Sequence, residues 1–296
     1  MSLPTSILRR VGLLTWDGPS VSERETRTLS VDDGDALRIE NRLGAVSVVG
    51  EDRADVLLDS EIRADSEELL AQTAVEATRH GDGIRVATSR PGWVQLGDVR
   101  VDLELRVPAE LRVDSVETSS GDLDVHGTAG DPTVSASSGD VTVTDVAGAV
   151  RATASSGAVT IRAVDAVSRA TASSGDIHVD VDGVVEKVQT NSGAITVEAE
   201  RVARAEASSG TVRLRVDAVD ADTVVSTSSG SVDLHAAAPV RATTRVDTSS
   251  GDVQIDGLGP SDGQFTSGTG VVTVPGDVAA TLSIETSSGD VTVHCG

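Results

Sequence analysis

Apolar and polar residues alternate along most of the chain, and a Ser-Ser-Gly triplet or a close variant interrupts the alternation at regular intervals. Alternation with a period of two, rich in β-branched residues, predicts strands with one buried face. Glycine tolerates positive φ, so the triplet predicts a turn between two short strands. The last glycines of the ten copies are Gly121, Gly139, Gly157, Gly175, Gly193, Gly210, Gly230, Gly251, Gly270 and Gly289.

The distance between successive copies ranges from 17 residues (Gly193 to Gly210) to 21 residues (Gly230 to Gly251). This is too short for a strand–helix–strand crossover with its turns. A four-stranded propeller blade needs about 40 residues and would make alternate copies differ, which they do not. We therefore predict an all-β fold, a parallel β-solenoid (β-helix) of about ten coils over residues 114–296, with stacked valines as its core.

Residues 24–113 lack the strict repeat but are also β-rich, and we predict that they cap the first coil. Gly44 and its neighbours resemble a degenerate repeat turn. One short helix is expected, with Ser66 as its N-cap and His80-Gly81 at its end. The predicted strands are Thr26–Val31, Leu37–Asn41, Val46–Val49, Val56–Ile62, Ile84–Thr88 and Val99–Val107.

Residues 1–23 are expected to form a separate N-terminal segment. Read as a helix, it places apolar residues on one face, so it is either an amphipathic interfacial anchor or a packed end cap. The order of charged and apolar residues does not fit a signal peptide, and there is no run of 18 apolar residues. The sequence alone therefore predicts a cytoplasmic chain, or one peripheral to a membrane through this segment.

The charge is strongly negative: 47 Asp and Glu against 24 Lys and Arg give a formal net charge of −23, and Lys187 is the sole lysine. Such a chain repels phosphate, which excludes nucleic acid as a partner. Salt at molar concentration screens like charges over about 3 Å, so the composition predicts adaptation to high salt. A GC-rich genome would explain the missing lysine but not the excess of acids.

The aromatic content excludes further classes of protein. The chain has two Trp, one Phe and no Tyr, which leaves nothing for a sugar-stacking or base-stacking platform. Cys295 is the one cysteine, so a disulfide framework and a cysteine-rich metal site are excluded.

The chain resembles a known family. Tandem Ser-Ser-Gly-Asp-Val-Thr-Val copies, preceded by TRTLSVDDGDALRIENRLGAVSVVG, are similar to the putative-adhesin family of prokaryotic β-strand-repeat proteins, a domain of unknown function, over about residues 25–296. The resemblance implies a β-solenoid and a role at the cell envelope or in adhesion, hence a cell-surface location. It rests on the repeat pattern and not on a catalytic signature.

Asp122 and Asp140 are weak candidates for a metal site. They follow the turn glycines of adjacent copies, and Ca²⁺ prefers clustered oxygen ligands. Other copies carry Ala, Thr, Ser or Val there, so a solvated acidic stripe is the simpler interpretation. His126, His235 and His294 share one position of the repeat, but consecutive stacking would place the closest pair three coils apart, about 14 Å. No metal site is therefore predicted.

The sequence offers no catalytic residues and no cofactor-binding motif. The repeated serines are turn residues, whereas a catalytic serine would be singular and paired with a histidine. We expect a non-enzymatic, rigid acidic rod that acts as an adhesin-like or envelope-associated scaffold for an unknown protein or cell-surface partner. One alternative is an element that stacks end to end through an uncovered last copy, unless the loop Gly257–Phe265 folds over that end. A remote alternative is a polysaccharide-acting β-helix enzyme.

Overall fold

The structure is a computed structural model that describes residues 21–81, 83–89, 98–256, 265–267, 270–274 and 280–295. The predicted N-terminal segment up to residue 20, Trp93 and most of the loop Gly257–Phe265 lie outside the described residues. The chain divides into two compact units, residues 1–148 and residues 149–296. The predicted boundary between residues 113 and 114 stays a prediction.

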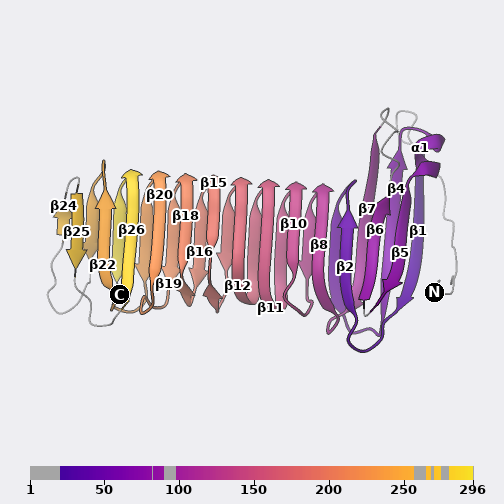
Figure 1. Cartoon of the computed structure of the whole chain (residues 1–296), viewed down its shortest axis with the longest axis horizontal. Coiled ribbons are helices and arrows are strands. Elements are labelled where there is room, and N and C mark those ends of the chain that lie inside the picture. Colours follow the sequence, from indigo (N-terminus) through magenta and orange to yellow (C-terminus); the bar gives the residue numbers. More distant parts are fainter. Residues whose placement is uncertain are drawn as a thin grey trace. The chain divides into compact units, whose positions relative to one another are not determined.

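The first unit is β-rich with one short helix, as its alternating sequence predicts (Figure 1). All six strands predicted before the repeats are present. Its elements up to residue 108 are β1 (Val21–Ser30), β2 (Ala36–Asn41), β3 (Val46–Glu51), β4 (Asp55–Ala64), α1 (Glu67–Gln72), β5 (Ala74–His80), β6 (Gly83–Ser89) and β7 (Val99–Pro108). The remainder are β8 (Arg112–Ser120), β9 (Leu123–His126), β10 (Thr133–Ser138) and the start of β11 (Val141–Ser156).

The helix is shorter than predicted. Ser66 is its N-cap and accepts a hydrogen bond from the Leu69 amide, as expected. The helix ends at Gln72, however, and Ala74–His80 is strand β5, antiparallel to β6. The physical reason is that β6 offers this segment an antiparallel partner, and burial accordingly alternates from Thr73 to Val75 with the period of a strand.

The segment around Gly44 occupies the position of a repeat turn, although Gly44 does not adopt positive φ. β2 before it runs parallel to β8, and β3 after it runs parallel to β9, in the register that places Val46 beside Leu123. On the other side, β6 pairs in parallel with β2, and β7 pairs in parallel with β3. Beyond them the strands are antiparallel: β5 pairs with β6, β4 pairs with β7, and β1 pairs with β4. The first unit is therefore a mixed sheet that becomes purely parallel toward the repeats.

The second unit consists of strands before and after each turn, paired in parallel with the same positions of the next repeat. Val179, for example, lies between Ile161 and Val197. Its elements are the second part of β11, β12 (Val159–Ser174), β13 (Ile177–Asp180), β14 (Val184–Val185), β15 (Val188–Ser192), β16 (Ile195–Ala199), β17 (Arg201–Val202), β18 (Arg204–Ser209), β19 (Val212–Val216), β20 (Thr223–Ser229), β21 (Val232–Ala236), β22 (Thr243–Thr248), β23 (Val253–Asp256), β24 (Phe265–Ser267), β25 (Gly270–Val274), β26 (Thr281–Ser288) and β27 (Val291–Cys295).

The core of each unit is aliphatic. In the second unit Ile177, Ile195, Val212 and Leu214 are no more than 1% exposed, and alternate residues of the same strands point outward. Each valine packs on an equivalent residue about 4.8 Å away in the neighbouring strand. This is how the chain buries a core with almost no aromatic residues.

The last copy of the repeat does not lie at the end of the stack, contrary to the expectation of an uncovered C-terminal coil. β26 runs parallel to both β20 and β22, and β27 runs parallel to both β21 and β23 (Figure 1). The chain therefore inserts residues 281–295 between two earlier repeats. The two outer neighbours are the copies whose turn glycines are Gly230 and Gly251.

The copy around Gly270 also departs from the prediction. β24 is antiparallel to β23, and β25 is antiparallel to β22, with Gly270 opposite Thr248. This copy therefore runs in the reverse direction, and Gly270 begins an edge strand instead of stacking on the other turn glycines. An antiparallel strand is the outermost element that the structure describes on this side of the second unit.

Candidate functional site

Of the ten predicted turn glycines, the nine other than Gly270 adopt positive φ, between +111° and +152°. In most of them a side chain would also collide with the neighbouring repeat. A Cβ on Gly139 would lie 2.2 Å from the carbonyl oxygen of Gly121, and one on Gly193 would lie 2.2 Å from that of Gly175. The glycines are thus required by both backbone conformation and close approach. The Ser-Ser pairs before them are exposed.

The aspartates after the turn have a structural partner. Asp122 Oδ1 accepts a hydrogen bond of 3.0 Å from the amide of Asp140, one repeat further along. Asp176 does the same for the Ala194 amide at 2.7 Å, and Asp290 for the Asp252 amide at 3.0 Å. These carboxylates therefore satisfy a backbone donor at each turn. In the described part of the chain, no group of three His, Cys, Asp or Glu side chains is placed to hold a metal ion.

The histidines are where the structure departs most from the sequence prediction. Because β27 is inserted beside β21, His235 and His294 are direct neighbours in register, and their ring centroids are 6.4 Å apart. The predicted separation of three coils is wrong for this pair. His126 lies in the first unit, where its Nδ1 is 3.5 Å from a carboxylate oxygen of Asp145. Only the pairing order of the last strands could have revealed the His235–His294 pair.

Charged side chains line up on both sides of this pair, one on each adjacent strand. The order across β16, β19, β21, β27 and β23 is Glu198, Arg215, His235, His294 and Asp256. Arg215 lies 3.8 Å from Glu198, and Asp256 Oδ2 lies 3.3 Å from Nδ1 of His294. The row is therefore a ladder of charged groups in which two imidazoles occupy the middle.

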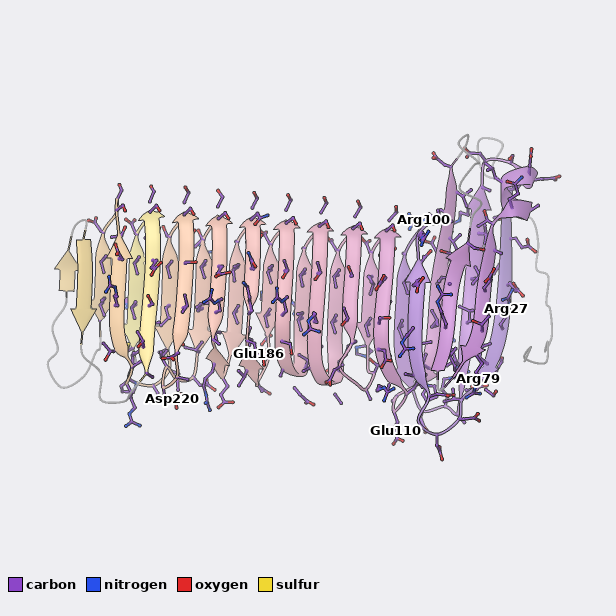
Figure 2. The ribbon with its side chains drawn as sticks, viewed as in Figure 1. Arg27, Arg79, Arg100, Glu110, Glu186 and Asp220 are labelled. Carbon is purple, nitrogen blue, oxygen red and sulfur yellow. The ribbon has the colours of Figure 1, made fainter. Side chains whose placement is uncertain are left out.

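A groove of about 520 Å³ follows the same outer face of the second unit. Both histidines line it, together with Arg213, Arg215 and Asp233. Figure 2 shows side chains projecting from the strands along this unit. The groove is lined by both polar and apolar side chains, and it brings two cationic side chains together in a chain whose net charge is −23.

A second groove of about 440 Å³ follows the strands before the turns, lined by Glu206, Asp247, Glu285 and several hydroxyl groups. Lys187 binds Glu206 at 2.8 Å, and this hydrogen bond lowers the pKa of the carboxyl. Because Glu206 is also paired with Arg204 at 2.6 Å, its charge is compensated.

The first unit carries a third groove, of about 620 Å³, over β1, β4 and β7. Ion pairs join these strands, among them Arg24 with Glu61 at 3.1 Å and Arg63 with Asp102 at 3.6 Å. Arg100 donates to the same Asp102, which raises the pKa of the guanidinium (Figure 2). This groove is a network of paired charges.

Cys295 is partly buried at the end of β27, and burial raises the pKa of its thiol. A thiol with a raised pKa is a weak nucleophile at neutral pH.

Residues 74–245, more than half of the chain, match the model of the Toastrack DUF4097 family. The chain belongs to this family. The sequence resemblance to a family of repeat proteins is thereby confirmed. None of the curated proteins matches the chain.

Several of the solved structures that match the chain are described as putative adhesins. A "putative adhesin" from Parabacteroides distasonis ATCC 8503 is 11% identical, with a TM-score of 0.51, over 93% of this chain and 98% of the other. A "putative adhesin" from Bacteroides fragilis NCTC 9343 is 9% identical, with a TM-score of 0.42, over 91% and 96%. At this identity the first similarity shows the fold of this Toastrack chain and no more: all-β, mostly parallel, with one short helix.

The helices that the structure describes in this Toastrack protein include none that is long and apolar enough to cross a bilayer. The candidate site is the charged outer face of the second unit, with the His235–His294 pair in its groove.

Proposed function

We propose that this Toastrack chain is a non-enzymatic β-solenoid scaffold whose outer faces provide an adhesin-like binding surface at the cell envelope. The observation that carries the proposal is the in-register pairing of equivalent positions. Val197 pairs with Leu214 inside, while Glu198 pairs with Arg215 outside. In-register pairing of this kind, with one inner and one outer column, supports a solenoid.

The surface suits a polar, charged partner and not an apolar one. Val184 is the one large apolar side chain that is clearly exposed in the described part of the chain. Arg213 and Arg215, on β19, line the groove of the second unit next to Asp233 and both histidines. A partner that pairs with these charges would bind in a salt-dependent way.

The experiment measures attachment of chain-coated beads to cells of the species that carries the gene. The groove variant Arg213→Ser/Arg215→Ser removes two positive charges from the groove. The control Arg204→Ser/Arg245→Ser removes two positive charges from the strands before the turns, so both variants have the same net charge. We expect the groove variant to attach at least tenfold less and the control to stay within about twofold.

Two results would contradict the proposal. Wild-type beads that attach no better than beads coated with an unrelated acidic protein would exclude an adhesin-like role. Release of reducing sugar from envelope polysaccharide by the purified chain would favour the polysaccharide-acting enzyme instead.

Self-association end to end is the second proposal. Its support is that β24 and β25 each pair on one side only in the described part of the second unit, so their outer edges present unpaired backbone groups. Light scattering in molar salt tests it, because a chain that stays monomeric at every concentration does not stack.

A further inference from the structure

We propose that His235 and His294 together bind a divalent transition metal ion of the zinc, nickel or copper class, with Asp256 as a positioning residue. The two imidazoles come from adjacent parallel strands and share one column of the repeat, with ring centroids 6.4 Å apart. Imidazole nitrogen is the preferred protein ligand for these three metals, whereas Ca²⁺ and Mg²⁺ prefer oxygen.

The geometry suits two nitrogen ligands on one ion. Neighbouring parallel strands lie about 4.8 Å apart, and each nitrogen must lie about 2.0–2.1 Å from a bound zinc ion. Both side chains are accessible: His235 is exposed and the side chain of His294 is 44% exposed. Rotation about the side-chain torsions of exposed residues is therefore enough to direct both rings to one ion.

Asp256 provides the supporting contact that metal-bound histidines usually have. Its Oδ2 lies 3.3 Å from Nδ1 of His294, so the Nδ1–H can donate to the carboxylate. That contact fixes the tautomer in which Nε2 carries the free lone pair and is available to a metal. Asp256 is on β23, directly opposite His294 in the parallel pairing of β23 with β27, and its side chain is only one-third exposed.

The surroundings favour a cation in spite of the neighbouring arginines. Arg215 is on the strand next to His235, but it lies 3.8 Å from Glu198, which offsets its charge. Asp233 and Asp290 line the same groove. The net charge of −23 raises the local concentration of cations over the whole surface.

The site is open. Within the described residues no three His, Cys, Asp or Glu side chains are placed around one ion, so water would complete the coordination. We therefore expect an exchangeable ion, held more weakly than in a closed structural site.

The test is calorimetric titration of the full chain with ZnCl₂, in a buffer that contains excess Mg²⁺ to occupy the carboxylates. We expect one zinc ion per chain. His235→Ala and His294→Ala should each abolish this binding, and Asp256→Asn should weaken it by about tenfold, because it keeps an acceptor but loses the charge.

The matched control is His126→Ala. His126 has a carboxylate partner, Asp145 at 3.5 Å, but its neighbours in the register are Val49 and Thr144 instead of a second histidine. This variant should bind zinc as the wild type does. Circular dichroism of each variant establishes that the fold is kept.

Electron paramagnetic resonance of the wild-type chain with Cu²⁺ gives a second readout that needs no variant. Coupling of the copper to two imidazole nitrogens supports the site. Coupling to one or none, or zinc binding that survives in the His235→Ala/His294→Ala chain, overturns the proposal. Because neither measurement involves a binding partner, its outcome is separate from that of the bead attachment assay.

Discussion

Substitution of one turn glycine should be more harmful than substitution of another glycine with positive φ elsewhere in the same unit. Gly139 has φ +128°, and a Cβ there would lie 2.2 Å from the Gly121 carbonyl oxygen and 2.5 Å from its carbon. Gly34 has φ +87°, and a Cβ there would meet no atom within 4 Å. Comparing Gly139→Ala with Gly34→Ala therefore separates backbone strain from close approach.

The expected magnitudes follow from these contacts. Positive φ costs an alanine about 1–2 kcal/mol at either position. At Gly139 the two repeats must also move apart by about 1 Å to reach ordinary van der Waals contact. That movement stretches two hydrogen bonds, from the Gly121 amide to Ser138 at 2.8 Å and from the Asp140 amide to Asp122 at 3.0 Å. At about 1 kcal/mol for each bond, Gly139→Ala should lose about 3–4 kcal/mol and Gly34→Ala about 1–2 kcal/mol.

The assay is urea unfolding followed by far-UV circular dichroism, at one fixed salt concentration. Hydrogen exchange of the Gly121 amide gives a local readout, and this amide should exchange faster in Gly139→Ala but not in Gly34→Ala. Equal losses of stability at the two positions, with exchange unchanged, would refute the close-approach argument.

Four further predictions concern the core, the turn aspartates, the salt and the pH. Val197→Asp buries an unpaired carboxyl and should cost on the order of 4 kcal/mol or more, whereas Thr196→Asp on the outer face should change stability by about 0.5 kcal/mol or less. Urea unfolding compares the two variants, and equal losses of stability would contradict the assignment of Val197 to the inner face and Thr196 to the outer face. Asp122→Ala should cost about 1 kcal/mol by leaving the Asp140 amide without its acceptor, and a thermal shift on adding Ca²⁺ that this variant lacks would instead support a calcium site. The melting temperature should rise from dilute buffer to molar KCl as the charge of −23 is screened, and a flat profile would leave the acidity without a role in salt adaptation. The hydrogen bond from Lys187 lowers the pKa of Glu206 in the folded state. The ionised carboxyl therefore stabilises the fold above the pKa of the unfolded state, near 4.5, and this contribution is lost as the pH falls through the pKa of the folded state. Glu206→Gln should make the urea midpoint less dependent on pH in that range, and a pH profile identical to that of the wild type would exclude the contribution.

Much of the fold was predictable from the sequence, because the alternation of residues within each strand specifies which of its faces is buried. The alternation of Val141, Thr142 and Val143 fixes which face is buried, since a strand has a period of two. The positive φ of the turns follows from the glycine in each triplet. Short-range patterns of this kind also located Ser66 as the helix N-cap and Gly44 as an additional turn.

Other features of local structure were not decided by local pattern. Ala74 and Ala77 are compatible with one face of a longer helix, but the strand forms because β6 offers an antiparallel partner. The turn aspartates have the composition of a calcium ligand set, but the carboxylates of Asp122, Asp176 and Asp290 each accept a hydrogen bond from a backbone amide of the adjacent repeat. In both cases the deciding partner lies on a neighbouring strand and not within the segment itself.

The sequence by itself therefore determined most of the strands, their buried faces, nine of the ten repeat turns and the family. Only the tertiary structure decided the order in which the repeats stack. Each repeat has nearly the same inward valines and the same turn, so the sequence pattern does not specify beside which copy the one that ends at Cys295 lies. Its insertion between β20 and β22 is what places His294 next to His235, and with them the candidate metal site.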